Sequence, residues 1–501
     1  MNPTLSKSEY IKGLQCPKAL WFQRFRKGLK PEINVAAQAQ FDTGNEISLL
    51  AQSYYPDGVK ITSHYSQIAS AEELTRRFIA KGHTILYEAT AISPVDGSHA
   101  RIDIFRKVEG SDAWDLIEVK STTSVKKPHI DDMALQFHAF SDAGYQINKC
   151  YMMMIDNTYV RSGKIELISL FRLEDISSQV QKKQAEVKVQ VEKLLTALDM
   201  NNQPTEEIGA RCNDPFECEY KGHCWKKVPE YSIFNIFSAK KADSIVKIAE
   251  SYEIKDIPSK FIPSAIKKID IEAYLTGNIV KDKIKIDCFL RHIQYPLYYL
   301  DYETIGPAIP LFDGTKPYEQ IPFQFSLHIQ NTAADELEHF EFLFREKADP
   351  RKAFTQSLIK LCGSEGSIIV YNKSFEAACN NKLGAAFPAY AEDLKKINQR
   401  MVDLLVPFKK RWLYSPTQKG SASIKAVLPA FSTLDYKELE IAGGGEASSK
   451  YQDFAKGNIS NQEADSLFEN LSKYCSLDTY AMFVLIEKMR TINNNPQGTK
   501  N

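Results

Sequence analysis

The sequence lacks long hydrophobic runs: its apolar stretches, such as residues 368–370, are far shorter than the roughly 20 residues that a membrane-spanning helix needs. Its first ten residues lack the apolar core of a signal peptide, so we expect a cytoplasmic protein that does not bind a membrane. It also has no internal repeat and no long low-complexity stretch. An excess of one charge is missing too, because 63 basic and 63 acidic residues give no global attraction to nucleic acid.

A chain of 501 residues, 43% of them hydrophobic, is predicted to be a folded protein too long for one ordinary domain. Helical and strand-like segments alternate over residues 1–230, a Lys- and Ile-rich helical stretch covers 231–287, and a second alternation covers 288–492. We therefore predict an α/β protein with two mixed α/β domains joined by a helical connector. The tail, 493–501, is predicted to be disordered.

A predicted β-hairpin over residues 100–120 places carboxylates beside a lysine. Asp103 lies on its first strand, whereas Glu118 and Lys120 are two residues apart on its second strand and project from one face. Asp103 and Glu118 offer the oxygen ligands that Mg²⁺ or Mn²⁺ prefers. Lys120 would then orient or help deprotonate the attacking water, whose pKa the metal lowers. A structural ion pair is the alternative.

The spacing of Asp103 and the Glu-x-Lys pair resembles the signature of the PD-(D/E)xK nucleases, in their RecB-like branch, which implies a restriction-endonuclease-like fold. Gln136 stands where that branch has a Gln-x-x-x-Tyr motif, although the last position here is Phe140. Glu88 stands where an upstream acidic residue is expected. Many relatives carry a metal-ligating His near position 46, where this chain has Glu46.

Nine cysteines without a secretion signal suggest metal or cluster ligands more than disulfides. Cys212, Cys218 and Cys224 are each separated by five residues, and Cys16 lies far upstream. One cysteine before the nuclease core and three after it resembles the iron–sulfur arrangement of RecB-like nucleases, including the CRISPR-adaptation exonucleases. The resemblance implies a structural [4Fe–4S] cluster, with zinc or free thiols as alternatives. Isolated cysteines are predicted to be ordinary buried residues: Cys150, Cys288, Cys362 and Cys379.

A second group of acidic residues is spread over three segments of the C-terminal half. An apolar strand runs into Asp301 and Glu303, which share a strand face about 7 Å apart. Glu376 falls in the first turn of a helix that follows another strand. Tyr474 and Asp478 are four residues apart and therefore lie on one helical face. Carboxylates gathered in this way can hold two metal ions, which clamp a phosphodiester during an in-line displacement.

In this order, the three segments resemble the DEDD exonucleases, which have an RNase H-like fold, in the branch with a Tyr-x-x-x-Asp motif. By that resemblance Tyr474 would position the water, and four carboxylates would bind metal: Asp301, Glu303, Glu376 and Asp478. Glu376 stands where Asp is usual, and Asp403 is a competing candidate. A degenerate site that binds nucleic acid without cutting it is the alternative.

Two segments combine cations with aromatic side chains, as contacts to a phosphate backbone and unstacked bases would require. Residues 1–30 hold seven Lys and Arg against Glu9 alone, with Trp21 and Phe22 among them. Residues 409–425 hold cations, a Trp and a Tyr within a Gly- and Ser-containing loop. The alternatives are a solvated helix face over a core stripe and an irregular surface loop.

The whole chain resembles an uncharacterised bacterial family that pairs a RecB-like nuclease module with a C-terminal domain of unknown function. We therefore expect a Mg²⁺- or Mn²⁺-dependent nuclease that hydrolyses phosphodiester bonds of DNA, as single strands or from ends, in repair, recombination or defence. The alternatives are an RNA-directed 3′–5′ exonuclease and a non-catalytic nucleic-acid-binding component of a larger machine. A helicase or other protein partner is compatible with either, and the sequence names none.

Overall fold

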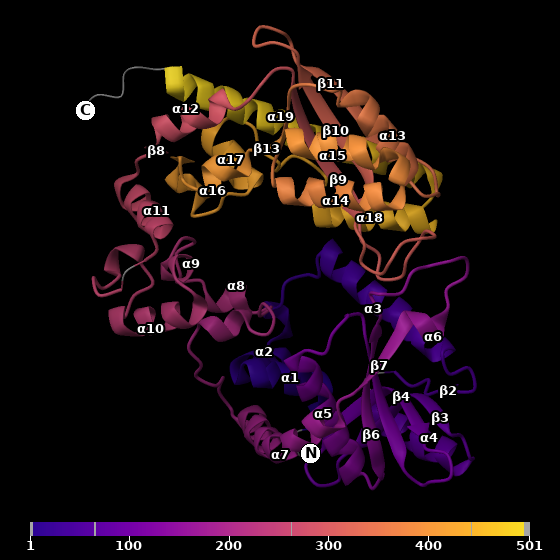
Figure 1. Cartoon of the computed structure of the whole chain (residues 1–501). Helices are drawn as coiled ribbons and strands as arrows, with labels where there is room; N and C mark the ends of the chain where they lie inside the picture. Colours follow the sequence, from indigo (N-terminus) through magenta and orange to yellow (C-terminus); the bar gives the residue numbers. More distant parts are fainter. Residues whose placement is uncertain (1–3, 65–66, 262, 442, 495–501) are drawn as a thin grey trace. The chain divides into compact units, whose positions relative to one another are not determined.

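The computed structural model describes four stretches of the chain: residues 4–64, 67–261, 263–441 and 443–494. The chain divides into two compact units, Met1–Pro229 (unit 1) and Glu230–Asn501 (unit 2), and each has its own mixed α/β core. In Figure 1 the sequence colours pass from indigo at the start of unit 1 to yellow at the end of unit 2. Among the described residues, no helix is both long enough and apolar enough to cross a bilayer.

Unit 1 is built on one mixed sheet of seven strands. Their bounds are β1 Leu5–Ser6, β2 Val59–Lys60, β3 Ile85–Ile92, β4 Ser98–Lys107, β5 Trp114–Lys120, β6 Ile147–Ile155 and β7 Phe171–Asp175. The order is β2-β3-β4-β5-β6-β7, and β1 pairs with β4 at the side of this path. Because β3, β4 and β5 pair antiparallel, the predicted hairpin over residues 100–120 is confirmed as β4 and β5.

Helices cover the unit 1 sheet and complete its core. Their bounds are α1 Lys7–Gln15, α2 Pro17–Phe25, α3 Val35–Ser53, α4 Ile68–Ala80, α5 Lys127–Asp142, α6 Leu167–Leu170, α7 Ser177–Asp199 and α8 Lys221–Cys224. Helix α1 begins with a capping box in which Ser6 and Glu9 bond to each other's backbone N–H groups. Leu116 on β5 and Leu135 on α5 belong to one core cluster, so α5 lies over the sheet next to the strand that carries Glu118.

Strand β3 is irregular at Glu88. The strand continues past Glu88 to Ile92. Glu88 has a φ of 60°, in the left-handed region that side chains other than glycine rarely adopt. Leu86 and Ala89 belong to the same core cluster although they are three residues apart, and an unbroken strand would turn them to opposite faces. The backbone twist at Glu88 therefore restores core packing on both sides of this residue.

Unit 2 contains a five-stranded mixed sheet and a two-stranded ribbon. The strand bounds are β8 Val280–Lys281, β9 Leu297–Ile305, β10 Ile321–Gln330, β11 Glu338–Leu343, β12 Ser367–Val370, β13 Met401–Asp403 and β14 Leu413–Tyr414. The large sheet has the order β11-β10-β9-β12-β13, with β11, β10 and β9 antiparallel and β9, β12 and β13 parallel. Strand β9 is central, and it includes Asp301 and Glu303, as predicted.

Helices cover both faces of the large sheet. Their bounds are α9 Ile233–Ile236, α10 Ala239–Ala249, α11 Ala265–Thr276, α12 Lys283–Arg291, α13 Arg351–Leu361, α14 Lys373–Ala386, α15 Ala391–Arg400, α16 Leu405–Lys409, α17 Ile424–Phe431, α18 Gly444–Lys456 and α19 Asn461–Asn494. On β9, Leu300 faces α13, α14 and α15, whereas Tyr299 faces α17 and α19. Of the predicted disordered tail, the first two residues end α19, and residues 495–501 lie outside the described residues.

The segment predicted as a connector, 231–287, lies within unit 2. Its strand β8 pairs with β14. Asp270 on α11 accepts two hydrogen bonds from the Arg411 guanidinium, at 2.6 and 3.2 Å, and both side chains are almost fully buried. This ion pair and the ribbon attach the segment to the C-terminal sheet domain.

Candidate functional sites

The register of three adjacent strands aligns three carboxylates of unit 1. The pairing of β3 with β4 places Glu88 opposite Asp103, between the pairs Tyr87–Ile104 and Ala89–Ile102. The pairing of β4 with β5 ends at Ile104–Ile117, and Asp103 and Glu118 are the next residues of the two strands beyond this pair. Residues that lie opposite each other project from the same face. Sequence positions 15 residues apart are therefore neighbours in the sheet.

Glu118 is the centre of the unit 1 site, which we define as Asp103, Glu118, Lys120, Asp132 and Gln136. Its carboxylate is 2% exposed and accepts bonds from Lys120 Nζ at 2.6 Å and Gln136 Nε2 at 2.9 Å. Lys120 also donates to Asp132 at 2.8 Å. Asp103 accepts a bond from the Val119 N–H at 2.7 Å, which fixes its carboxylate beside β5.

Lys7, from the start of α1, also reaches this site. Its Nζ lies 2.7 Å from Glu118 Oε1 and 3.6 Å from Asp132 Oδ1. Our sequence analysis did not assign a role in this site to Lys7 or to Asp132. Asp132 could have been found from its position, because it is four residues before Gln136 on the same helical face. Lys7 could not, because only the tertiary fold brings residues 7 and 118 together.

The two lysines determine the charge state of the unit 1 site. Burial raises the pKa of Glu118, but the charges and hydrogen bonds of Lys120 and Lys7 outweigh burial and lower it below its ordinary value. Burial and the neighbouring Glu118 charge raise the pKa of Asp103 to about 7. Burial lowers the pKa of Lys120, but Asp132, Glu118 and Asp103 raise it well above the ordinary value. Lys120 therefore carries a positive charge that can orient a water or a phosphate.

The remaining predicted residues of unit 1 lie at different distances from this group. Burial raises the pKa of Glu88, and the charges of Glu118 and Lys7 act on it as well, which places its carboxylate near the site. Glu46 lies half-buried on α3. Phe140 is fully buried in the core cluster, so this position has a packing role in place of a tyrosine hydroxyl.

The four predicted ligand cysteines line one small cavity. Cys16 ends α1 and precedes α2, whereas Cys212, Cys218 and Cys224 come from the loop region that closes unit 1. Burial raises the pKa of Cys16, Cys218 and Cys224, so a bound cation would be needed to stabilise them as thiolates. This donor set fits a metal or cluster. Of the cysteines predicted to be buried, Cys288 is exposed, which contradicts that prediction.

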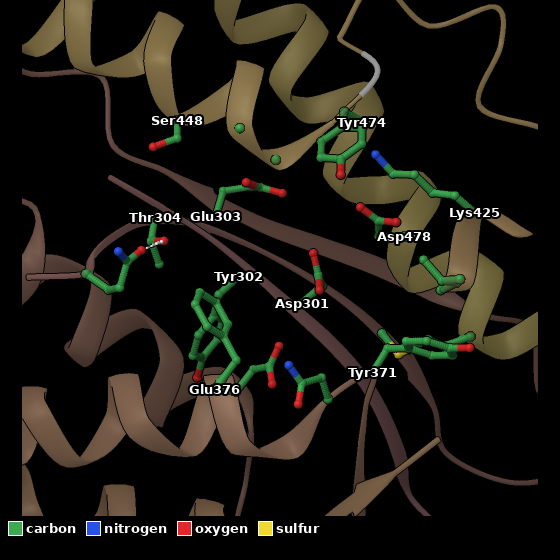
Figure 2. Close-up of a pocket in the computed structure, with 17 residues that line it drawn as sticks. Asp301, Tyr302, Glu303, Thr304, Tyr371, Glu376, Lys425, Ser448, Tyr474 and Asp478 are labelled. Atoms are coloured by element: carbon green, nitrogen blue, oxygen red, sulfur yellow. Dashed lines mark hydrogen bonds between the residues drawn. The ribbon is translucent and has the colours of Figure 1, made fainter. Parts of the chain in front are cut away.

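In unit 2, three carboxylates converge on one point. Asp301 and Glu303 project from β9 toward α19, which carries Asp478. One ligand oxygen from each lies within 4.8 Å of the other two. Figure 2 shows Asp301 and Asp478 turned toward each other, with Glu303 beside them. Such an arrangement can hold a divalent ion through oxygen ligands.

Glu376 approaches the same cavity from α14. It lies in the first turn of this helix, as predicted, and is 2% exposed. Its Oε2 atom is buried and has no hydrogen-bond partner among the described residues. The competing candidate Asp403 instead accepts bonds from the Asn372 and Leu405 N–H groups and does not line the cavity. Glu376 is therefore the fourth member of the unit 2 site, with Asp301, Glu303 and Asp478.

Two tyrosines and a lysine surround Asp478. Tyr436 Oη donates to Asp478 Oδ1 at 2.6 Å, and Tyr474 also bonds to this carboxylate. The Lys425 Nζ lies 5.5 and 5.0 Å from the ring centres of Tyr436 and Tyr474. Tyr436 has no sequence motif that assigns it to the site. Lys425 lies in the cationic loop that we singled out for strand binding.

The unit 2 carboxylates resist ionisation together. Burial raises the pKa of Asp301 well above its ordinary value, and the charges of Asp478, Glu303 and Glu376 add to this effect. Burial and the Asp478 charge raise the pKa of Glu303 to about 8. Burial raises the pKa of Glu376 to about 8 and that of Asp478 to about 6. A bound divalent cation would supply the missing positive charge, so the residues fit a metal.

The unit 2 carboxylates open into a cavity of about 440 Å³. This volume lies in the range of roughly 300–1,000 Å³ that is typical of small-ligand sites. Asp301 and Glu376 line one part, the start of α18 and Lys425 line another, and Tyr302, Tyr371, Phe375 and Tyr474 add aromatic surface.

The two segments predicted to bind nucleic acid are more structural than expected. In residues 1–30, Trp21 and Phe22 are buried, and Lys12 and Lys30 both pair with Glu219. In residues 409–425, Arg411 and Tyr414 are buried, so neither can contact a strand. These side chains, which we had assigned to nucleic-acid binding, instead pack against or pair with other residues of the same unit.

Residues 298–423 match the family described as "Domain of unknown function (DUF2779)". The match includes Asp301, Glu303 and Glu376. The match shows that this part of unit 2 has relatives, and the family description assigns no activity to them. An uncharacterised bacterial family is thereby supported.

Curated relatives are likewise uncharacterised bacterial proteins. The chain is 27% identical over 232 residues to the uncharacterised protein UU173 of Ureaplasma parvum serovar 3, which covers 42% of this chain and 34% of that protein. It is 30% identical over 213 residues to the uncharacterised protein MG366 of Mycoplasma genitalium, which covers 38% of this chain and 31% of that protein. A Mycoplasma pneumoniae homologue of MG366 is 28% identical over 208 residues. The chain spans about a third of the length of these relatives.

Proposed function

We propose that this protein is a divalent-metal-dependent nuclease that hydrolyses phosphodiester bonds, with DNA as the favoured substrate. The observation that carries the proposal is the convergence of Asp301, Glu303 and Asp478 within 4.8 Å, beside the unpartnered Glu376 oxygen. Buried carboxylates without counter-charge are costly, so their retention in a cavity suits a site that works with bound cations.

In this proposal Mg²⁺ or Mn²⁺ would be held by Asp301, Glu303 and Asp478, with Glu376 as a further ligand. A divalent ion bound there lowers the pKa of a bound water and neutralises charge on a phosphate. Tyr436 holds the Asp478 carboxylate in position. Tyr474, which lines the cavity, would orient the water. Three antiparallel strands followed by two parallel ones support an RNase H-like assignment for this domain.

Unit 1 would contribute a second nuclease site of the PD-(D/E)xK type. Its support is the bond from the Val119 N–H to Asp103, beside Glu118, and the bond from Gln136 to Glu118. Asp103 and Glu118 would hold the metal, and Lys120 would orient the attacking water or the phosphate. Lys7 and Lys120 both form ion pairs with Glu118. A metal ion that binds Glu118 would therefore compete with two ammonium groups.

The test is degradation of end-labelled single-stranded and double-stranded DNA by the full chain in Mg²⁺ or Mn²⁺. Asp301→Asn is expected to remove most cleavage, and Lys120→Ala to remove the share that unit 1 contributes. If both variants cut as well as the wild type, the proposal is wrong. A matched RNA strand run beside the DNA separates the alternative of an RNA-directed exonuclease. Binding without cutting in either metal would instead favour a non-catalytic nucleic-acid-binding component.

We further propose that the four cysteines bind a [4Fe–4S] cluster that closes unit 1. In the described part of the chain, no three cysteine sulfurs lie within 4.8 Å of one another, whereas the sulfurs on a tetrahedral zinc are about 4 Å apart for Zn–S bonds near 2.3 Å. Anaerobic purification should give absorbance near 400 nm, with about four irons per chain. Cys218→Ser should lose both signals. If the protein instead contains one zinc per chain and lacks this absorbance, the four cysteines bind zinc and the cluster proposal is wrong.

A further inference from the structure

The cavity of unit 2 has a second wall with the opposite electrostatic character. Helix α18 begins there with Gly443 as its N-cap and with Gly444 and Gly445 lining the cavity. The first N–H groups of a helix have no acceptor within the helix, and together with the helix dipole they favour an anion. A glycine N-cap offers no side-chain oxygen to these groups. The helix has 13 residues, long enough for a substantial dipole.

Lys425 adds a full positive charge beside this helix end. A Cβ atom built on Gly443 would lie 3.3 Å from Lys425 Nζ, so the ammonium group and the helix start are adjacent. A Cβ atom on Gly444 would lie 3.6 Å from Glu303 Oε2, so the helix start also adjoins the carboxylates. A ligand in the cavity would therefore meet carboxylates on one side and the α18 N–H groups with Lys425 on the other. Glu446, in the first turn of α18, pairs with Lys450 and does not line the cavity.

Glu376 indicates what such a ligand contains. Its buried Oε2 atom has no partner among the described residues, and Figure 2 shows its carboxylate directed toward Asp301. An unpaired carboxylate oxygen calls for a cation, whereas the N–H groups at the α18 start favour an anion, next to the positive charge of Lys425, which also acts on Glu303 and Asp478. A metal-bound phosphate satisfies both. Phe375, which is partly exposed in the same cavity, offers a ring against which a base could stack.

We propose that the N-terminus of α18 and Lys425 form a phosphate subsite that holds the terminal nucleotide of a strand by its phosphate group. This inference rests on the proposed nuclease function and names the part of the substrate that the unit 2 site recognises. A cavity of about 440 Å³ is suited to one nucleotide, not to a duplex. The same site would bind the product, a nucleoside 5′-monophosphate.

The test compares thymidine 5′-monophosphate with thymidine, by calorimetric titration of the full chain in Mg²⁺. Wild type should bind the monophosphate at least about tenfold more tightly, because charge-assisted hydrogen bonds of this kind are worth roughly 1.5–3 kcal/mol. Lys425→Met should reduce this preference to less than about threefold. Lys409→Met is the matched control, since Lys409 is exposed and does not line the cavity.

A second variant guards against misfolding of Lys425→Met. Gly444→Ala adds a methyl group at an ordinary contact distance of 3.6 Å, so the fold should tolerate it while the helix N-terminus is partly covered. It should also lose the preference for the monophosphate. Equal binding of both ligands by the wild type, or a preference that survives in both variants or is lost equally in the Lys409 control, overturns the subsite.

The outcomes for the subsite and for the nuclease proposal are distinct. If strands are cut but the monophosphate has no advantage, the nuclease proposal stands and the subsite is wrong. If no strand is cut but the preference depends on Lys425, the subsite stands and the nuclease proposal is wrong.

Discussion

The two acidic sites differ in how their negative charge is compensated. In unit 1, the ammonium groups of Lys7 and Lys120 both bond to Glu118 and also lie near Asp132. In unit 2, Lys425 alone is basic among the described residues that line the cavity. Burial therefore leaves Asp301 and its neighbours with pKa values above their ordinary range, whereas the pKa of Glu118 is below its ordinary range. The unit 2 carboxylates therefore have less compensating positive charge than those of unit 1, and a bound cation would stabilise them more.

The largest effect should come from removing a unit 2 ligand. Asp301→Asn is expected to weaken Mn²⁺ binding more than about 100-fold, because even outer-shell partners of a metal ligand contribute about 10–100-fold. Isothermal titration of Mn²⁺ measures it. Glu118→Gln, the corresponding change in unit 1, should leave the tightest binding event unchanged. If Glu118→Gln removes that event and Asp301→Asn does not, the order of the two sites is reversed.

Removing a lysine that pairs with Glu118 should make the unit 1 site bind metal more tightly, as we expect of the unit 2 site. Lys7→Met is expected to strengthen Mn²⁺ binding at the unit 1 site about tenfold, because Glu118 loses one of two charge-assisted hydrogen bonds that compete with the metal. The measurement is a Mn²⁺ titration in the Asp301→Asn background. Lys12→Met is the matched control, since Lys12 lies on the same helix but pairs with Glu219. Equal effects of the two changes would mean that Lys7 does not guard Glu118.

The smallest expected effect is on the stability of the metal-free protein. The folded-state pKa of Glu303 and of Glu376 is about 8, above the ordinary 4.5. Between these two pH values, the two groups bind more protons in the folded protein than in the unfolded chain. Their contribution to the free energy of unfolding is therefore fully present below pH 4.5 and is lost as pH rises through about 8. In EDTA, the melting temperature should fall between pH 5 and pH 8.

Asp301→Asn sharpens this prediction. The substitution removes a buried carboxyl with a raised pKa, so at pH 8 in EDTA the variant should melt at least about 3 °C above the wild type. Added Mg²⁺ should stabilise the wild type more than the variant, which keeps only the unit 1 site. A variant that melts lower than the wild type under all conditions would show that Asp301 contributes to the fold and not to a cation site.

Local spacing predicted the parts of each site that one element carries. The two-residue spacing of Asp301 and Glu303 and the four-residue spacing of Tyr474 and Asp478 each follow from strand or helix geometry. The hairpin likewise predicted Asp103 beside Glu118. The resemblance assigned Glu376 to the site with Asp403 as a competing candidate, and of these two only Glu376 lines the cavity.

The residues that spacing missed reach their sites through tertiary packing. Lys7 and Glu118 are 111 positions apart, and Tyr436 and Asp478 are 42 apart, so no local pattern connects them. The two sites differ in how basic side chains compensate their carboxylates, and this compensation depends on residues that are far apart in the sequence. Glu88 was predicted as a site residue, but its positive φ within β3 was not. A strained backbone position has no signature in side-chain periodicity.

The buried pair of Asp270 and Arg411 sets a limit on how the protein can be shortened. A recombinant fragment that starts at residue 288 would delete Asp270 and strand β8, leaving a guanidinium that is 5% exposed without its counter-ion. An uncompensated buried charge of this kind typically costs about 3–5 kcal/mol. A fragment that starts at residue 230 keeps both partners, and it is the version of the C-terminal half with which separate biochemistry should begin.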